Sequence, residues 1–188
     1  MTNPKFDIQV GKVLISEPFL PDPNFRRTVV LVTDYGNHGT IGFVLNQVTD
    51  YAVNMLLLEL PGINTSAYQG GPVELESFHY IHRYSHIAKS SKIMDGVYWS
   101  GDFEEIHSGL KDNTLHAEDF KFFIGYSGWA PGQLEQELEE KSWLIGDLDP
   151  NLLFDTTIAD SDLWKHAIRG MGGTHALLAN SPIDPNLN

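Results

Sequence analysis

Three histidines close together in the sequence could supply ligands to a metal ion. His79, His82 and His86 would share one face if their segment were a helix. The aromatic and apolar residues between them favour a strand, and on a strand His79 and His82 point to opposite faces. The sequence therefore predicts no metal site, and ordinary histidines on a sheet surface. The chain contains no cysteine, which excludes disulfides, thiolate nucleophiles and cysteine-ligated metals.

One serine occupies the place that the nucleophile takes in α/β-hydrolases. Ser127 follows a predicted strand and precedes a predicted helix, but Trp129 stands where the Gly-x-Ser-x-Gly motif needs its second glycine. A bulky side chain there obstructs the sharp turn, and the spacing identifies no histidine or carboxylate partner. We expect a buried, hydrogen-bonded serine rather than an acyl-transfer enzyme.

The glycine-rich turn and helix over 125–138 could present free N–H groups to an anion. Glutamates crowd the helix, and the segment lacks the Lys-Ser/Thr pair of a P-loop. The favoured interpretation is structural: Trp129 fills a core pocket, Pro131 starts the helix, and Gln133 hydrogen-bonds a neighbouring loop.

Two neighbouring arginines, Arg26 and Arg27, form the one candidate anion-binding site in this otherwise acidic sequence. The competing interpretation is that Arg27 ties its turn to Asp22 or to the acidic C-terminal half. The pair Gly70-Gly71 is interpreted first as a constrained turn and second as a place where a ligand approaches the backbone.

The formal net charge of −13 lies almost entirely in the C-terminal half. Residues 95–188 hold 5 Lys and Arg against 17 Asp and Glu. Such a field repels phosphate backbones and anionic lipids, so direct nucleic-acid and membrane binding are disfavoured. One interpretation of the acidity is that it keeps the protein in solution. The other is that charge drives contact with a protein partner, which should then be basic.

The pattern of β-branched, apolar and turn residues predicts a mixture of strands and helices without strict βαβ alternation. Strands are expected over 10–16, 28–33, 40–46, 77–84, 93–100 and 120–127. Helices are expected over 49–60, from 102 to 109, over 131–141, and from a cap at Ser161. Glycine and asparagine over 34–39 predict a hairpin that makes its flanking strands antiparallel.

This mixture predicts an α+β protein with a mixed but mainly antiparallel sheet flanked by helices. One domain should cover residues 1–180, followed by a loose tail over 181–188 that is rich in proline and asparagine. The sequence shows no signal peptide and no apolar run long enough to span a membrane, so a cytoplasmic location is expected.

Four segments together resemble the YqgE/AlgH family. They are GKVLIS with DPNFRRTVV over 11–16 and 22–30, GTIGFVLN over 39–46, GGPV over 70–73, and GYSGWAPGQLEQEL over 125–138. The resemblance implies an α+β fold with a strongly curved, largely antiparallel sheet. It implies no established activity; members are sometimes described as transcriptional regulators.

The favoured function is a non-enzymatic binding or regulatory module that acts through protein or small-ligand contacts, with no catalytic residue, metal or cofactor. The expected binding residues are Arg27, Thr28, Asn46, Gly70, Gly71, Trp129 and Gln133. The alternative is a hydrolase-like enzyme on a small anionic substrate, for which the spacing assembles no acid-base pair. A DNA-binding regulator ranks third because of the charge, and the oligomeric state stays open.

Overall fold

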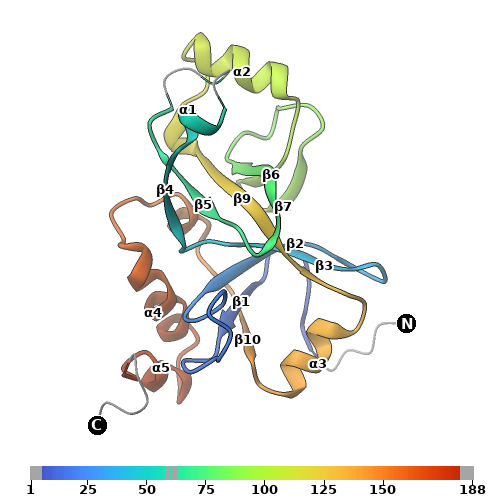
Figure 1. Ribbon diagram of the computed structural model, residues 1–188, viewed down its shortest axis with the longest axis vertical. Helices are drawn as coiled ribbons and strands as arrows, with labels where there is room; N and C mark the ends of the chain where they lie inside the picture. The colour runs from blue at the N-terminus through green and yellow to red at the C-terminus, as the bar shows by residue number, and fades with distance from the viewer. Residues whose placement is uncertain (1–5, 58–59, 61–62, 183–188) are drawn as a thin grey trace.

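The computed structural model describes residues 6–57, 60 and 63–182, which form an α+β fold built on one large, open sheet (Figure 1). Ten strands of the described residues join in the order β10-β1-β2-β3-β9-β6-β8-β7, with β5 also beside β9 and β4 beside β5. All strand pairs are antiparallel except β5 with β9. This confirms the predicted fold class.

The strands are β1 (Val13–Ser16), β2 (Val29–Gly36), β3 (Gly39–Val44), β4 (Val48–Ala52), β5 (Ser66–Gln69), β6 (Val73–His82), β7 (Ser91–Met94), β8 (Val97–Trp99), β9 (Phe120–Trp129) and β10 (Trp143–Gly146). The α-helices are α1 (Val53–Leu56), α2 (Phe103–Lys111), α3 (Gln133–Glu139), α4 (Asp160–Gly170) and α5 (His175–Leu178). Two short 3₁₀ helices cover Ala117–Asp119 and Pro150–Leu153.

The long strand β9 crosses the middle of the molecule and joins two parts of the sheet (Figure 1). Along one edge β9 pairs with β6; along the other, its first half pairs with β5 and its last residues pair with β3. The change of partner occurs around Gly125, whose φ is +63°, and a Cβ there would lie 2.7 Å from the Val73 carbonyl oxygen. Glycine tolerates both the left-handed backbone and the close approach. The sheet can therefore turn at this point.

Helices cover different faces of the two parts of the sheet. In the lower part, α4 lies on one side of β1 and β2 and α3 lies on the other (Figure 1). The buried face of α4 carries Leu163, Trp164, Ala167 and Ile168, spaced as an amphipathic helix requires. In the upper part, α1 and α2 pack near Phe120 and Phe122 of β9 (Figure 1). No helix of the described residues is long and apolar enough to cross a membrane.

The predicted helix over 49–60 is wrong for its first residues. Residues Val48–Ala52 form the edge strand β4, paired with β5, and the helix α1 is confined to Val53–Leu56. The proposed stop at Pro61-Gly62 lies outside the described residues. Two strands, β5 and β10, were not predicted. The predicted strand over 93–100 is instead a hairpin of β7 and β8 around Asp95-Gly96, a dipeptide typical of two-residue turns.

The predicted helix starts have different outcomes. Asp102 caps α2 as expected, because its side chain accepts from the backbone N–H groups of Glu104 and Glu105. Pro131 does not begin α3, since Gly132 in the left-handed conformation is the N-cap and the helix starts at Gln133. Ser161 is not a cap either: α4 starts one residue earlier, at Asp160.

Candidate functional site

Asn46 and Thr28, two of the predicted binding residues, are used to hold the backbone. The Asn46 side chain accepts from the Val29 N–H at 2.9 Å and donates to the Arg27 carbonyl at 2.9 Å. The Thr28 N–H donates to the Ser16 hydroxyl at 2.9 Å, and the Thr28 hydroxyl donates to a carbonyl in the preceding turn. These bonds fix the start of β2 against its neighbours.

Arg27 binds the C-terminal part of the chain through backbone carbonyls. Its Nη2 donates to the carbonyls of Ser181 at 2.7 Å and Pro182 at 2.5 Å, and its guanidinium lies 4.8 Å from the centroid of the Trp164 ring. Burial lowers the pKa of Arg27, and its Nε is buried without a hydrogen-bond partner among the described residues. Of the predicted tail, Ser181 and Pro182 are held by this contact; residues 183–188 lie outside the described residues.

Gly70 and Gly71 form the tight connection from β5 toward β6. The Gly70 N–H donates to Ile124 at 2.9 Å, and the Gly70 carbonyl accepts from the Val44 N–H and from the Ser127 hydroxyl, the latter at 2.9 Å. A Cβ on Gly71 would lie 2.3 Å from the Tyr126 backbone. The constrained turn is as predicted, and so is the buried, hydrogen-bonded Ser127.

Trp129 is 5% exposed, packed beside the rings of Phe25 and Trp143. Its Nε1 donates to Glu137 at 2.9 Å, and the same carboxylate oxygen accepts from the Trp143 Nε1 at 2.7 Å. Gln133 accepts from the Ala130 N–H at 3.0 Å, so it binds the turn before its own helix and not a neighbouring loop as predicted.

Trp129 and Gln133 border an open pocket of about 410 Å³ that does not include Arg27, Thr28, Asn46, Gly70 or Gly71. The carboxylates of Glu137 and Glu140 also line it, which makes the pocket acidic. The predicted binding residues therefore do not share one groove, and each has a structural role.

The histidines do not form a metal centre. No group of three His, Cys, Asp or Glu side chains in the part of the chain that the structure describes could hold a metal ion. His82 is fully buried, which corrects the prediction that it lies on the sheet surface. One ring nitrogen of His82 lies 2.7 Å from the Ser100 carbonyl and the other accepts from the Tyr84 N–H at 3.2 Å. Burial lowers the pKa of His82, so the ring is neutral and structural.

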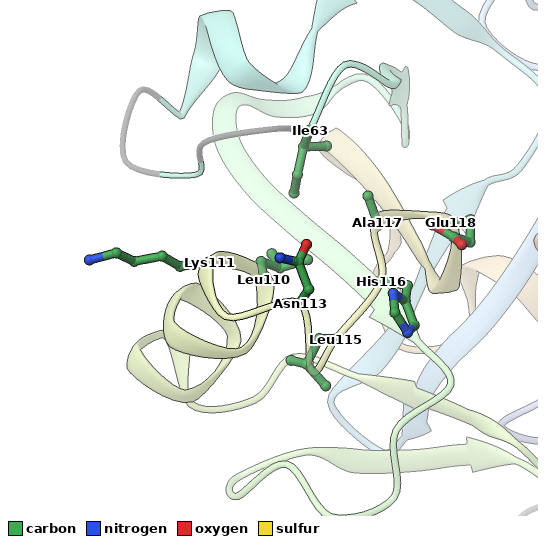
Figure 2. Close-up of a pocket in the computed structure, with 8 residues that line it drawn as sticks. All are labelled: Ile63, Leu110, Lys111, Asn113, Leu115, His116, Ala117 and Glu118. Carbon is green, nitrogen blue, oxygen red and sulfur yellow. The ribbon is translucent and has the colours of Figure 1, made fainter.

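A pocket of about 500 Å³ lies between the C-terminal end of α2 and the chain leading to β9. Figure 2 shows its apolar wall, formed by Ile63, Leu110 and Leu115, and shows the Lys111 side chain pointing away from the other lining residues. Asn113, His116 and Glu118 also line this pocket, but none of its described lining residues is a buried charged group comparable to Lys121.

A second pocket of about 500 Å³ contains a buried amine and is the strongest candidate site. We call it the Lys121 pocket; it lies between β5, the start of β9 and the segment after Pro150–Leu153. Its lining residues are Val48, Asn64, Thr65, Ser66, Tyr68, Ala117, Glu118, Phe120, Lys121, Phe122, Leu153, Phe154, Asp155 and Thr156. Six of these side chains are apolar and eight are polar or charged, so the pocket offers both apolar contacts and hydrogen-bonding groups.

Lys121 is only 9% exposed, and its Nζ lies 3.8 Å from the centroid of the Tyr68 ring. Within the described residues this amine makes no hydrogen bond and no salt bridge. Burial lowers the pKa of Lys121 to about 8, and the negative charge of Asp160 partly opposes that shift. Burial, followed by the nearby Asp160 carboxylate, raises the pKa of Tyr68 to about 12. The site thus combines an amine that can become neutral near physiological pH with a phenol that stays protonated.

Sequence reasoning missed Lys121, although a signal was present. The lysine is a single charge inside the aromatic run Phe120-Lys121-Phe122-Phe123, and alternation along a strand places it on the opposite face from Phe120 and Phe122. A charged residue in a strand that is buried on both faces marks a special environment.

The fold defines the class of this protein: an α+β protein built on one large, open and mainly antiparallel sheet. The chain belongs to the AlgH-like family (DUF179), whose family model matches residues 13–176. This confirms the resemblance drawn from the sequence motifs.

Relatives match over nearly their full lengths. A UPF0301 protein of Cytophaga hutchinsonii is 39% identical over 95% of this chain and 98% of its own, and one of Chlorobium limicola is 35% identical over 100% of both. The solution structure of the AlgH protein from Pseudomonas aeruginosa has a TM-score of 0.71, with 25% identity over 97% of each chain. A Corynebacterium diphtheriae protein shares the fold, with a TM-score of 0.77 and 19% identity over 94% of each chain.

Proposed function

We propose that this protein is a non-enzymatic binding or regulatory module that holds a small ligand in the Lys121 pocket. The observation that carries the proposal is the Lys121 amine, which lines the pocket without an acceptor among the described residues. The Lys121 side chain is mostly buried, but its amine is not one of the fully buried polar atoms that lack a partner, so the amine reaches solvent and a ligand that accepts from it would replace water. The pocket volume lies within the usual range for small-molecule sites.

The surrounding charges indicate which ligand fits. Glu118 and Asp155 line the pocket, and Asp160 acts on the amine from nearby. These carboxylates oppose the entry of an anion. The apolar walls favour a hydrocarbon body. The best ligand is therefore a small, neutral, largely apolar molecule with one hydrogen-bond acceptor.

The hydrolase alternative gains no support from the geometry, because the Ser127 hydroxyl is buried and committed to the Gly70 carbonyl. The cytoplasmic location and a contact with a basic protein stay predictions.

Binding of 2-pentanol, followed through backbone amide shifts in nuclear magnetic resonance spectra, tests the proposal. We expect saturable shifts at Tyr68, Lys121 and Phe154, and weaker binding of pentanoate, which has a similar body and a negative charge. Lys121→Met should weaken 2-pentanol binding roughly 10-fold, because it removes a charged donor. The control Lys92→Met removes an exposed lysine that is paired with Asp95, and should change nothing. Shifts confined to another surface, or equal binding to Lys121→Met, would contradict the proposal.

A further inference from the structure

We propose that the ligand of the Lys121 pocket is a small aldehyde or ketone, which Lys121 binds as a reversible imine. The inference rests on the proposed function and names the ligand class of the same site. It stands on the placement of a buried amine, the Tyr68 phenol and an apolar cavity in one pocket.

The first requirement for an imine is an amine that is free to attack a carbonyl carbon. The Lys121 Nζ lies over the Tyr68 ring and is engaged by no hydrogen bond or salt bridge within the described residues. Other lysines differ: Lys12 and Lys92, for example, are held by carboxylates that raise their pKa. Burial lowers the pKa of Lys121 to about 8, so about a quarter of this amine is neutral at pH 7.5 against about 0.1% for an ordinary lysine.

The second requirement is a proton donor for the departing oxygen. The Lys121 nitrogen bonds to the carbonyl carbon and gives a carbinolamine, which then loses water as the C=N bond forms. Tyr68 can donate one proton to the departing hydroxyl and regain one from the nitrogen, so both protons of the amine leave in the water and nothing is oxidised or reduced. Burial, followed by Asp160, raises the pKa of Tyr68 to about 12, so this phenol is protonated at pH 7.5, although it is a weaker acid than an ordinary tyrosine.

The third requirement is a cavity that accepts a neutral carbonyl compound and disfavours charged ones. Leu153 and Phe154 supply apolar contacts for an alkyl or aryl body. Glu118 and Asp155 oppose a carboxylate on the ligand. We therefore expect simple aldehydes and ketones to be preferred over 2-oxo acids.

Trapping with sodium cyanoborohydride tests the inference on the full chain. The protein is incubated with 2-pentanone at about pH 7.5, and adducts are located by intact mass and by peptide mapping. We expect one adduct at Lys121, formed at least about 10-fold faster than at any other lysine because of the larger neutral fraction. The adduct should be absent in Lys121→Met and unchanged in Lys92→Met. Adduct formation with 2-oxopentanoate should be slower.

Two further measurements separate a reactive site from a merely accessible amine. The rate at Lys121 should rise with pH and level off above about pH 8, whereas rates at exposed lysines should still rise near pH 10. Tyr68→Phe keeps the ring but removes the proton donor, so it should slow adduct formation roughly 10-fold or more while 2-pentanol still binds.

The controls distinguish this inference from the proposed function. If 2-pentanol and 2-pentanone both bind in the pocket but no adduct forms at Lys121, the imine is refuted and the binding function stands. If neither compound binds and no adduct forms, both are refuted. Adducts spread evenly over the exposed lysines also refute the imine.

Discussion

We expect Lys121 to make the free energy of unfolding depend on pH, and we expect Lys121→Met to remove that dependence. Burial lowers the pKa of Lys121 from 10.5 to about 8 in the folded chain. Between those values the unfolded chain keeps the proton that the folded chain has lost, so the free energy of unfolding rises with pH. The destabilisation is full below about pH 8 and is relieved as the pH approaches 10.5.

The magnitude follows from the same two pKa values. From about pH 7 to about pH 9.5, the wild type should gain about 2 kcal/mol of unfolding free energy relative to Lys121→Met, which cannot titrate at this position. At pH 7 the variant should be more stable than the wild type by about 1 to 3 kcal/mol, because an apolar side chain replaces a buried charge.

Urea unfolding at several pH values measures this difference, provided that the slope of free energy against urea is the same for both proteins. Taking the difference between the two proteins cancels the titration of shared groups. Lys92→Met is the matched control. Because the Lys92 pKa is raised, the difference in unfolding free energy between Lys92→Met and the wild type should not change with pH up to about pH 9.5. Parallel curves for the wild type and Lys121→Met would refute the assigned environment of Lys121 and weaken both proposals.

Trp129→Ala should lower the free energy of unfolding by roughly 3 to 5 kcal/mol, because the ring is buried and its removal leaves a cavity; a near-wild-type urea midpoint would refute this anchoring role. Arg27→Met should speed hydrogen exchange and proteolysis around Ser181 and Pro182 and leave the central strands protected, since the lost bonds reach only those carbonyls. Purified protein should show no measurable affinity for duplex DNA at physiological salt in a fluorescence titration, since 17 Asp and Glu in the C-terminal half oppose binding; micromolar binding would restore the regulator hypothesis.

Local chemistry was enough to predict much of the fold. The β2–β3 hairpin was predictable because Gly36 and Gly39 sit between two β-branched runs, and its strands pair antiparallel through Tyr35 and Thr40 to Gly36 and Gly39. Asp102 was identifiable as a cap because its carboxylate acts within the first turn of the helix. Such features depend on residues close in sequence.

Features that depend on distant partners were not predictable. The apolar spacing after Thr49 fits a helix, but Val48 and Ala52 pair with Tyr68 and Ser66 of β5, a strand without a strong pattern of its own. The pocket was missed for the same reason. Nothing near Lys121 in the sequence shows that Tyr68 will lie against its amine.

The predicted binding residues and Lys121 differ in how the fold uses their polar groups. Asn46, Gly70 and Gln133 form hydrogen bonds that hold strands or turns, so replacing them should first reduce stability. Lys121 differs, because its side chain is only 9% exposed, its amine makes no hydrogen bond within the described residues, and its lowered pKa predicts that it weakens the fold at neutral pH. A methionine would fill a similar volume without that cost, so folding alone does not explain the lysine. Ionisable groups with strongly shifted pKa values gather at functional sites, and the turn of the sheet at Gly125 brings β5 and Tyr68 beside this one. We therefore propose the ligand site at this destabilising side chain rather than at the well-bonded ones.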